Sequence, residues 1–375
     1  MKGTGGEGTG RESRLHDHSG ITRQSLSSET PPLRDGYVME KLAVHHIPQA
    51  ARCFASTFVH GEILAHAVSL SQYDMIEFAH IFLEYLAIEG MSWCVVDEVS
   101  GDCIAFLLID DYVAPSAEAI ASGVLERMEQ ATPLGLGLVF GFLEEMKVAC
   151  LAKLEEVGHT PARGEIFHII AVGADPISRG RGLTMKLIGR AYFECLEAGY
   201  TSAVMEATGF ASQKLAREFT MSSDDDGRII MTKSYATYNT PYGKIFAGVQ
   251  VSDCVLTYQR AAESREGRDF QEAMFFLGSY KELVQSASTA TQLAMYGYFQ
   301  QAVKGPANAP QNVDKKPPRF QMVARSMFNA WRSLGSMPTD EARRRLTALV
   351  QKVSGVKWSG VEGSGVEWSG VEWSG

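Results

Sequence analysis

The chain has 375 residues, of which 45% are hydrophobic and 21% charged, as in soluble globular proteins of about two domains. Its net charge of −9 argues against non-specific binding of nucleic acid. No run approaches the roughly 18 apolar residues of a transmembrane segment, and the first residues lack the apolar stretch of a secretory signal. The six cysteines show no CxxC spacing, so we expect reduced, buried thiols in a cytoplasmic protein.

Both ends of the chain are predicted to be flexible tails. Residues 1–35 are rich in Gly, Ser and charge, and they cannot bury enough apolar surface to fold. Residues 354–375 repeat a five-residue unit that contains Ser-Gly each time, which is typical of low-complexity sequence. Two folded bodies are therefore expected between the tails.

The first body, residues 36–251, alternates strand-like and helix-like segments. Its expected strands are 37–42, 92–98, 102–110, 167–172, 202–205 and 228–233. Its expected helices are 48–58, 116–157, 184–198 and 213–218. Ser100-Gly101 between the second and third strands is the signal of a hairpin turn. This order predicts an α/β or α+β fold with strands throughout.

The second body, residues 269–353, has apolar residues at helical spacing and no convincing strand. Four helices are expected, at 270–284, 293–303, 323–334 and 342–353, which predicts an all-α four-helix domain. Between the bodies, residues 252–268 are interpreted as a brief strand followed by a charged linker.

A basic, glycine-rich turn joins an apolar strand to a helix in the first body. After the strand 167–172, the chain continues through Pro176 into the sequence RGRGLT at residues 179–184. Backbone N–H groups at the start of a helix lack intrahelical partners, and the helix dipole adds positive potential, so such a turn suits a pyrophosphate. Gly180 and Gly182 let phosphate oxygens approach closely. A basic turn without a ligand is the alternative.

The pattern R-x-x-G-x-G/A, here Arg179, Gly182 and Thr184, resembles the coenzyme A signature of the Gcn5-related N-acetyltransferases (GNAT). Thr184 departs from the usual Gly or Ala. The resemblance implies a GNAT fold with a mixed, splayed central sheet, whose free strand backbone binds the pantetheine arm. The implied acyl-CoA contacts are Ile170, Ala171, Val172, Arg179, Gly180, Arg181, Gly182, Leu183 and Thr184.

Two stretches, residues 205–213 and 235–246, resemble the insect-type arylalkylamine and dopamine N-acetyltransferases. That resemblance implies Glu62 as the general base, with Thr208 and Ser212 as hydroxyl partners, although the Asp and Pro that usually flank this glutamate are missing. The tyrosine that many GNAT enzymes use as the acid is also missing, and Ala216 or a neighbour takes its place. Helix capping is the alternative role for Thr208 and Ser212, and a surface or capping position is the alternative for Glu62. His168 is a further candidate, but a lone histidine is more often structural, and no cluster has zinc spacing.

The second body resembles the acyl-CoA-binding protein (ACBP) family in residues 295–305 and 328–334. In that family, aromatic rings hold the adenine and lysines hold the 3′-phosphate. The implied contacts are Tyr296, Phe299, Gln300, Lys304, Arg325 and Trp331. Gln300 and Met327 stand where the family has its lysines, and Leu346 stands at a family tyrosine. The domain therefore either binds acyl-CoA with other cations or serves to dock a protein partner.

Together the two resemblances imply an N-acyltransferase that moves an acetyl or longer acyl group from acyl-CoA to a primary amine, an arylalkylamine being favoured. Direct attack in a ternary complex is expected, with the helical domain raising the local concentration of acyl-CoA. No metal is expected. The alternative is a non-catalytic acyl-CoA sensor or adaptor whose helical domain docks protein partners.

Overall fold

The computed structural model describes residues 36–219, 231–261, 265–312, 317 and 321–355, and the predicted tails lie outside these ranges apart from Ser354 and Gly355. A seven-stranded sheet in the order β1-β2-β3-β4-β5-β7-β6 forms the first body. Its strands are β1 (Tyr37–Lys41), β2 (Trp93–Asp97), β3 (Cys103–Asp111), β4 (Ile166–Ala174), β5 (Ser202–Ala207), β6 (Met231–Ser234) and β7 (Asp253–Arg260). Only β4 and β5 are parallel neighbours, so the sheet is mixed, as predicted.

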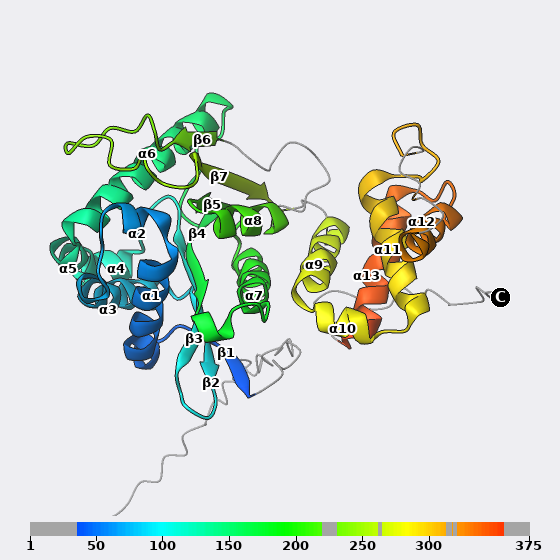
Figure 1. The fold of residues 1–375 in the computed structure, drawn as a ribbon, viewed down its shortest axis with the longest axis horizontal. Helices are drawn as coiled ribbons and strands as arrows, with labels where there is room; N and C mark the ends of the chain where they lie inside the picture. The colour runs from blue at the N-terminus through cyan, green and yellow to red at the C-terminus, as the bar shows by residue number, and fades with distance from the viewer. Residues whose placement is uncertain (1–35, 220–230, 262–264, 313–316, 318–320, 356–375) are drawn as a thin grey trace, which may run out of the picture.

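Helices cover both faces of this sheet (Figure 1). The first face carries α1 (Ile47–Gly61), α2 (Ile63–Ala67), α3 (Gln72–Glu89), α4 (Ala117–Ala121), α5 (Val124–Ala131) and α6 (Leu134–Glu156). The second face carries α7 (Leu183–Glu197) and α8 (Phe210–Phe219). Short 3₁₀ turns occur at Val44–His46 and Pro176–Ser178. No helix among the described residues combines the length and the apolar character needed to cross a bilayer.

The parallel strands β4 and β5 part halfway along their length. They are paired from Ile166↔Ser202 to Ile169↔Met205 and no further, although β4 continues to Ala174 and β5 to Ala207. Beyond this point β4 is bonded to β3 alone and β5 to β7 alone. In the pairing of β4 with β3, Ile169 and Ala171 face successive residues of β3, so Ile170 between them forms a β-bulge. A bulge bends its strand, and this one lies where β4 separates from β5. The splayed sheet of the predicted fold is therefore present.

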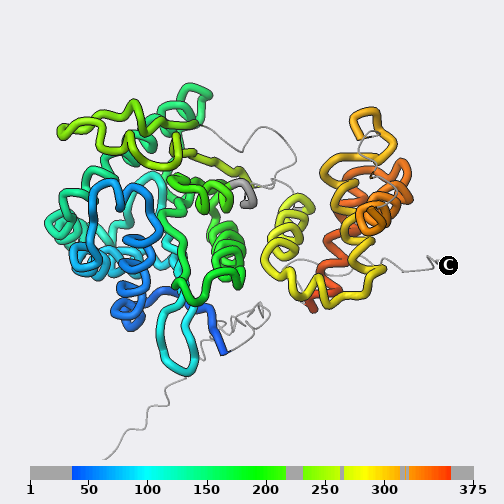
Figure 2. The backbone as a smooth tube through the Cα atoms, viewed as in Figure 1, coloured from blue at the N-terminus to red at the C-terminus, as the bar shows by residue number. Residues whose placement is uncertain are grey.

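In the described residues of the C-terminal body every regular element is a helix, as predicted (Figure 2). It contains α9 (Arg265–Ser279), α10 (Lys281–Ser286), α11 (Thr289–Lys304), α12 (Met322–Ser333) and α13 (Thr339–Ser354). Its core joins residues of α9, α11 and α13, with Ala273, Ala342 and Leu346 fully buried. The first of the four predicted helices is divided into α9 and α10 at Tyr280.

Two expectations about the chain order need correction. The segment 252–268 is not mainly a linker, because Asp253–Arg260 forms β7, which lies between β5 and β6 in the sheet. The long helix expected over 116–157 is three helices, interrupted at Gly123 and at Pro133. Gly123 adopts a φ of 69° at the start of α5, a left-handed conformation that interrupts a helix. All six cysteines are buried and unpaired, as expected.

Candidate active site

The glycine-rich turn has the backbone geometry of an anion site. Gly180 and Gly182 have φ values of 81° and 71°, in the left-handed region that favours glycine. Gly182 is the N-cap residue of α7, and no side chain caps this helix within the described part of the chain. The first N–H groups of α7 are therefore available to a phosphate, at the positive end of the helix dipole.

The two arginines of the turn point to different neighbours. Arg181 hydrogen-bonds the hydroxyl group of Tyr37 and lies over its ring, with 5.3 Å between the guanidinium carbon and the ring centroid. Arg179 donates to the carbonyl oxygen of Ala174 at 3.4 Å. Its Nη2 lies 3.8 Å from the position that a Cβ atom on Gly61 would occupy. Arg179 thus reaches from the turn to the end of α1.

Substitution of Gly182 with alanine is expected to weaken coenzyme A binding about tenfold, because the left-handed conformation costs an L-residue about 1–2 kcal/mol and the turn is then displaced. Isothermal titration with coenzyme A measures the effect. The matched control is Gly101→Ala in the β2–β3 turn, where φ is also positive (73°) and a Cβ meets nothing within 4 Å. Equal loss of affinity in both variants would contradict an anion site at this turn.

Glu62 and Thr208 lie together, although 146 residues separate them in the chain. Glu62 lies between α1 and α2, where its Oε1 accepts a hydrogen bond from the backbone N–H of Leu64 at 3.1 Å. The Thr208 hydroxyl donates to Oε2 of Glu62 at 2.7 Å. Burial raises the pKa of Glu62 above its ordinary value, and the hydrogen bond from Thr208 opposes this effect. The pair follows β5 directly, at the point where β5 has separated from β4.

The remaining hydroxyl candidate, Ser212, has a local role in the structure. Its Oγ accepts from the N–H of Gly209 at 2.9 Å and donates to the Gly209 carbonyl oxygen at 3.0 Å, which is a capping arrangement at the start of α8. Tyr235, which was not among the candidates from the sequence, contacts the pair directly, since its hydroxyl group donates to the carbonyl oxygen of Thr208 at 2.9 Å. Ala216, at the expected place of the family tyrosine, is fully buried.

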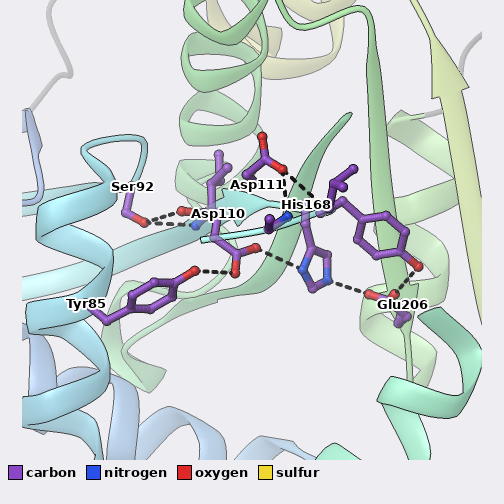
Figure 3. A network of polar contacts seen from close by, with 10 residues as sticks. Tyr85, Ser92, Asp110, Asp111, His168 and Glu206 are labelled. Carbon is purple, nitrogen blue, oxygen red and sulfur yellow. Dashed lines mark hydrogen bonds and ion pairs between the residues drawn. The ribbon is translucent and has the colours of Figure 1, made fainter. Parts of the chain in front are cut away.

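A second polar cluster lies across β3, β4 and β5 and is centred on His168 (Figure 3). The Nδ1 atom of His168 lies 3.1 Å from Oδ1 of Asp110, and its Nε2 atom lies 2.6 Å from Oε2 of Glu206. Tyr85 donates to Oδ2 of Asp110 at 3.0 Å, and Tyr112 donates to Oε1 of Glu206 at 3.2 Å. Every polar atom of the imidazole and of the two carboxylates therefore has a partner.

The charges in this cluster are strongly coupled. Burial disfavours the imidazolium ion, but the negative charge of Glu206 and the hydrogen bonds to both carboxylates outweigh it and raise the pKa of His168 to about 10. Burial likewise opposes ionisation of Glu206, and the positive charge of His168 lowers its pKa nonetheless. An imidazole that is protonated at neutral pH cannot accept a proton from an amine, so His168 is not suited to act as the base.

Three donors near β1 could in principle hold a metal ion, namely Glu40, His45 and His46, whose ligand atoms lie within 4.8 Å of one another. The backbone N–H of Ala43, however, donates to Nδ1 of His46 at 3.1 Å. The ring proton of neutral His46 is therefore on Nε2, which lies 2.8 Å from Oε2 of Glu40. This arrangement is a satisfied hydrogen bond, and it leaves His46 without a free lone pair for a metal.

In the helical domain, Trp331 is buried and links α12 to α11. Its Nε1 donates to Oε1 of Gln301 at 3.1 Å and to the carbonyl oxygen of Gly305 at 3.0 Å. Gln301 in turn donates to the carbonyl oxygen of Met337 at 2.6 Å. With 2% of its surface exposed, Trp331 is placed as a core residue rather than as a platform for adenine.

Comparisons with known proteins show what this domain is similar to. The family described as "Acyl CoA binding protein" matches residues 267–350. The C-terminal helices match this family over less than a quarter of the chain, and by this likeness they are called the acyl-CoA-binding domain. Acyl-CoA-binding domain-containing protein 4 of Oryza sativa subsp. japonica is 33% identical over 85 residues, which make up 23% of this chain and 24% of that protein. The chain therefore spans about a quarter of the length of this curated relative.

Solved structures are similar to the N-terminal part of the chain. The C-terminal condensation domain of Ebony, in complex with beta-alanyl-dopamine, has a TM-score of 0.48 and 14% identity, covering 60% of this chain and 98% of its own. Arylalkylamine N-acetyltransferase 2 from Aedes aegypti has a TM-score of 0.43 and 18% identity, covering 60% of this chain and 99% of its own.

The implied ligand contacts of the acyl-CoA-binding domain differ in their exposure. Lys304 is exposed, whereas Tyr296, Phe299 and Arg325 are partly buried. Gln300, at the place of a family lysine, is 6% exposed, and its Oε1 has no hydrogen-bond partner within the described residues. A buried amide oxygen without a partner is costly, so this position fits a ligand that donates a hydrogen bond better than it fits a phosphate.

Proposed function

We propose that the first body is an acyl-CoA-dependent N-acyltransferase that acylates a primary amine. The observation that carries the proposal is the placement of the Glu62–Thr208 pair. The pair lies where β4 and β5 separate, and Arg179 of the anion turn approaches Gly61, the neighbour of Glu62. An acid–base group thus lies at the opening between β4 and β5, the strands proposed to hold the pantetheine arm whose far end carries the thioester.

The separated strands supply the remaining parts of the proposed reaction. In the parallel register, Ile170, Ala171 and Val172 follow the last paired residue of β4, so their backbone groups on the β5 side are open to an extended amide chain. A backbone N–H there stabilises the oxyanion as the amine nitrogen attacks the thioester carbon. A C–N bond forms and the C–S bond breaks. Glu62 accepts a proton from the amine nitrogen, and the thiolate of coenzyme A gains one proton in the end.

The acyl-CoA-binding domain supports acyl-CoA as the donor, including acyl chains longer than acetyl. Its covalent attachment gives the transferase site a high effective concentration of the donor. We favour an arylalkylamine as the acceptor. Six free, buried cysteines are consistent with a reducing compartment, and we place the reaction in the cytoplasm.

A panel of amines crossed with acyl-CoA chain lengths, followed by release of free thiol, tests this proposal. We expect release with at least one arylalkylamine, and we expect the intact protein to show a larger melting shift with palmitoyl-CoA than with acetyl-CoA. Absence of thiol release with every amine, together with a normal coenzyme A affinity, would overturn the enzymatic proposal. Equal melting shifts would count against longer acyl chains.

A non-catalytic acyl-CoA sensor or adaptor is the second candidate. It is favoured by Gln300 and Met327, which replace the two phosphate-pairing lysines of the family pattern in the acyl-CoA-binding domain. In this case the helical domain docks a protein partner instead of delivering a donor. The same thiol-release panel separates the two candidates, since a sensor binds coenzyme A without turnover.

A further inference from the structure

The helix α7 is covered on both sides, which is unusual for a helix lying on the outer face of a sheet. Its residues 185–189 are buried without interruption, and Ala191 and Tyr192 are buried as well. A helix that packs on a sheet with one face normally leaves the opposite face in solvent. Figure 1 shows that α9 of the acyl-CoA-binding domain lies along α7.

Aromatic packing joins the two helices into one core. Phe275 of α9 belongs to the same hydrophobic cluster as the sheet residues under α7. Its ring centroid lies 5.0 Å from that of Tyr192 and 5.6 Å from that of Phe193. Gly189 lies at the contact as well, because a Cβ there would lie 3.7 Å from Cβ of Phe275, an ordinary van der Waals distance. Without α9, this aromatic surface of the transferase body faces water.

Polar contacts extend the interface to the first turns of α7. The Ser279 hydroxyl donates to the carbonyl oxygen of Met185 at 3.2 Å. Lys186 is 7% exposed, and its Nζ lies 2.7 Å from Oε1 of Glu282 and 5.0 Å from the ring centroid of Tyr280. A buried ammonium group of this kind requires its partner, because an unpaired buried charge is strongly unfavourable.

These contacts lie next to the anion turn. A Cβ on Gly182 would lie 3.7 Å from the carbonyl oxygen of Ser279, so the end of α9 reaches the N-cap of α7. At the other end of the interface, burial and the negative charges of Asp269 and Glu197 raise the pKa of Glu272 to about 8, while Arg190 opposes them. The helices are thus close together along their length.

We propose that the acyl-CoA-binding domain is docked on α7 through α9 and α10, and that this docking holds the N-terminus of α7 in position to bind the pyrophosphate. The proposal rests on the proposed function, since it assumes that coenzyme A binds at the turn before α7. On this proposal, the acyl-CoA-binding domain directly raises the affinity of the transferase site for coenzyme A. A flexibly tethered domain would act on local concentration alone.

The Lys186–Glu282 pair allows a test in the full chain. In Glu282→Lys, two like charges face each other, and we expect the KM for acetyl-CoA to rise about tenfold while the KM for the amine stays constant. Amide exchange of residues 186–192, whose N–H groups are bonded within α7, is expected to accelerate in the same variant. Adding Lys186→Glu restores an opposite pair and is expected to return both values to within about twofold of the wild type. Lys281→Glu, at the exposed neighbouring position of α10, is the matched control and should change neither.

Two outcomes would overturn the docking proposal. One is an unchanged KM for acetyl-CoA in Glu282→Lys, whether or not amide exchange accelerates. The other is a raised KM that the charge exchange does not restore, which would indicate direct contact of Glu282 with the ligand. A failure of the proposed function is distinct from both. In that case the wild type transfers no acyl group, and the effect of docking is still measured by amide exchange of α7 with and without coenzyme A.

Discussion

Replacing Glu62 with glutamine is expected to lower kcat for acyl transfer by about 10²- to 10⁴-fold and to leave the affinity for acyl-CoA unchanged. The carboxylate is held by Thr208 and by the backbone of Leu64, so glutamine fills the same space but cannot accept a proton from the ammonium ion. Steady-state rates measure the loss, and titration with coenzyme A measures binding. Glu129→Gln makes the same change at an exposed position of α5 and serves as the control.

The pH profile of kcat/KM gives a second measure of the role of Glu62 as the base. Burial raises the pKa of Glu62, so in the wild type kcat/KM should fall as the pH drops through a value above 4.5. This acidic limb is the protonation of the base, and it should be missing from the residual activity of Glu62→Gln. If the variant keeps both the rate and the acidic limb, another group is the base. If it loses acyl-CoA affinity together with the rate, Glu62 has a structural role.

The conformation of the glycine-rich turn at residues 179–184 could be predicted from the sequence because its physical requirements leave a local signature. Two glycines at positive φ, flanking arginines and a following helix occur within six residues. The pairing of Glu62 with Thr208 has no such signature. It joins the break between two helices to the end of a strand, and only the family resemblance brought the two residues together.

Other features depend on tertiary contacts that periodicity does not encode. β7 has a short apolar pattern, and its place between β5 and β6 became clear only from the pairing of strands. Lys186 in an amphipathic helix is ordinarily expected in solvent, yet the partner that buries it is almost 100 residues away. The His168 cluster likewise consists of single polar residues in three strands, each of which is ambiguous by itself.

Replacing His168 with leucine is expected to lower the free energy of unfolding by about 3–5 kcal/mol at pH 7, because it leaves Asp110 and Glu206 as buried carboxylates without their cation. The side chains of His168 and Asp110 are 18% exposed, and that of Glu206 is 5% exposed, so solvent screens the remaining repulsion weakly. Urea denaturation of the full chain measures the change. His80→Leu, at an exposed position of α3, is the control and should have little effect.

The loss of unfolding free energy in His168→Leu should also depend on pH in a defined direction. The pKa of His168 is raised from 6.5 to about 10, so the stability gained from its protonation is fully present below pH 6.5 and disappears as the pH rises through about 10. The difference between wild type and His168→Leu should therefore be largest near pH 6.5 and should shrink as the pH rises toward about 10. A stability difference that stays constant over this pH range would show that His168 contributes by packing. A loss below about 1 kcal/mol would contradict a buried ion triad of Asp110, His168 and Glu206.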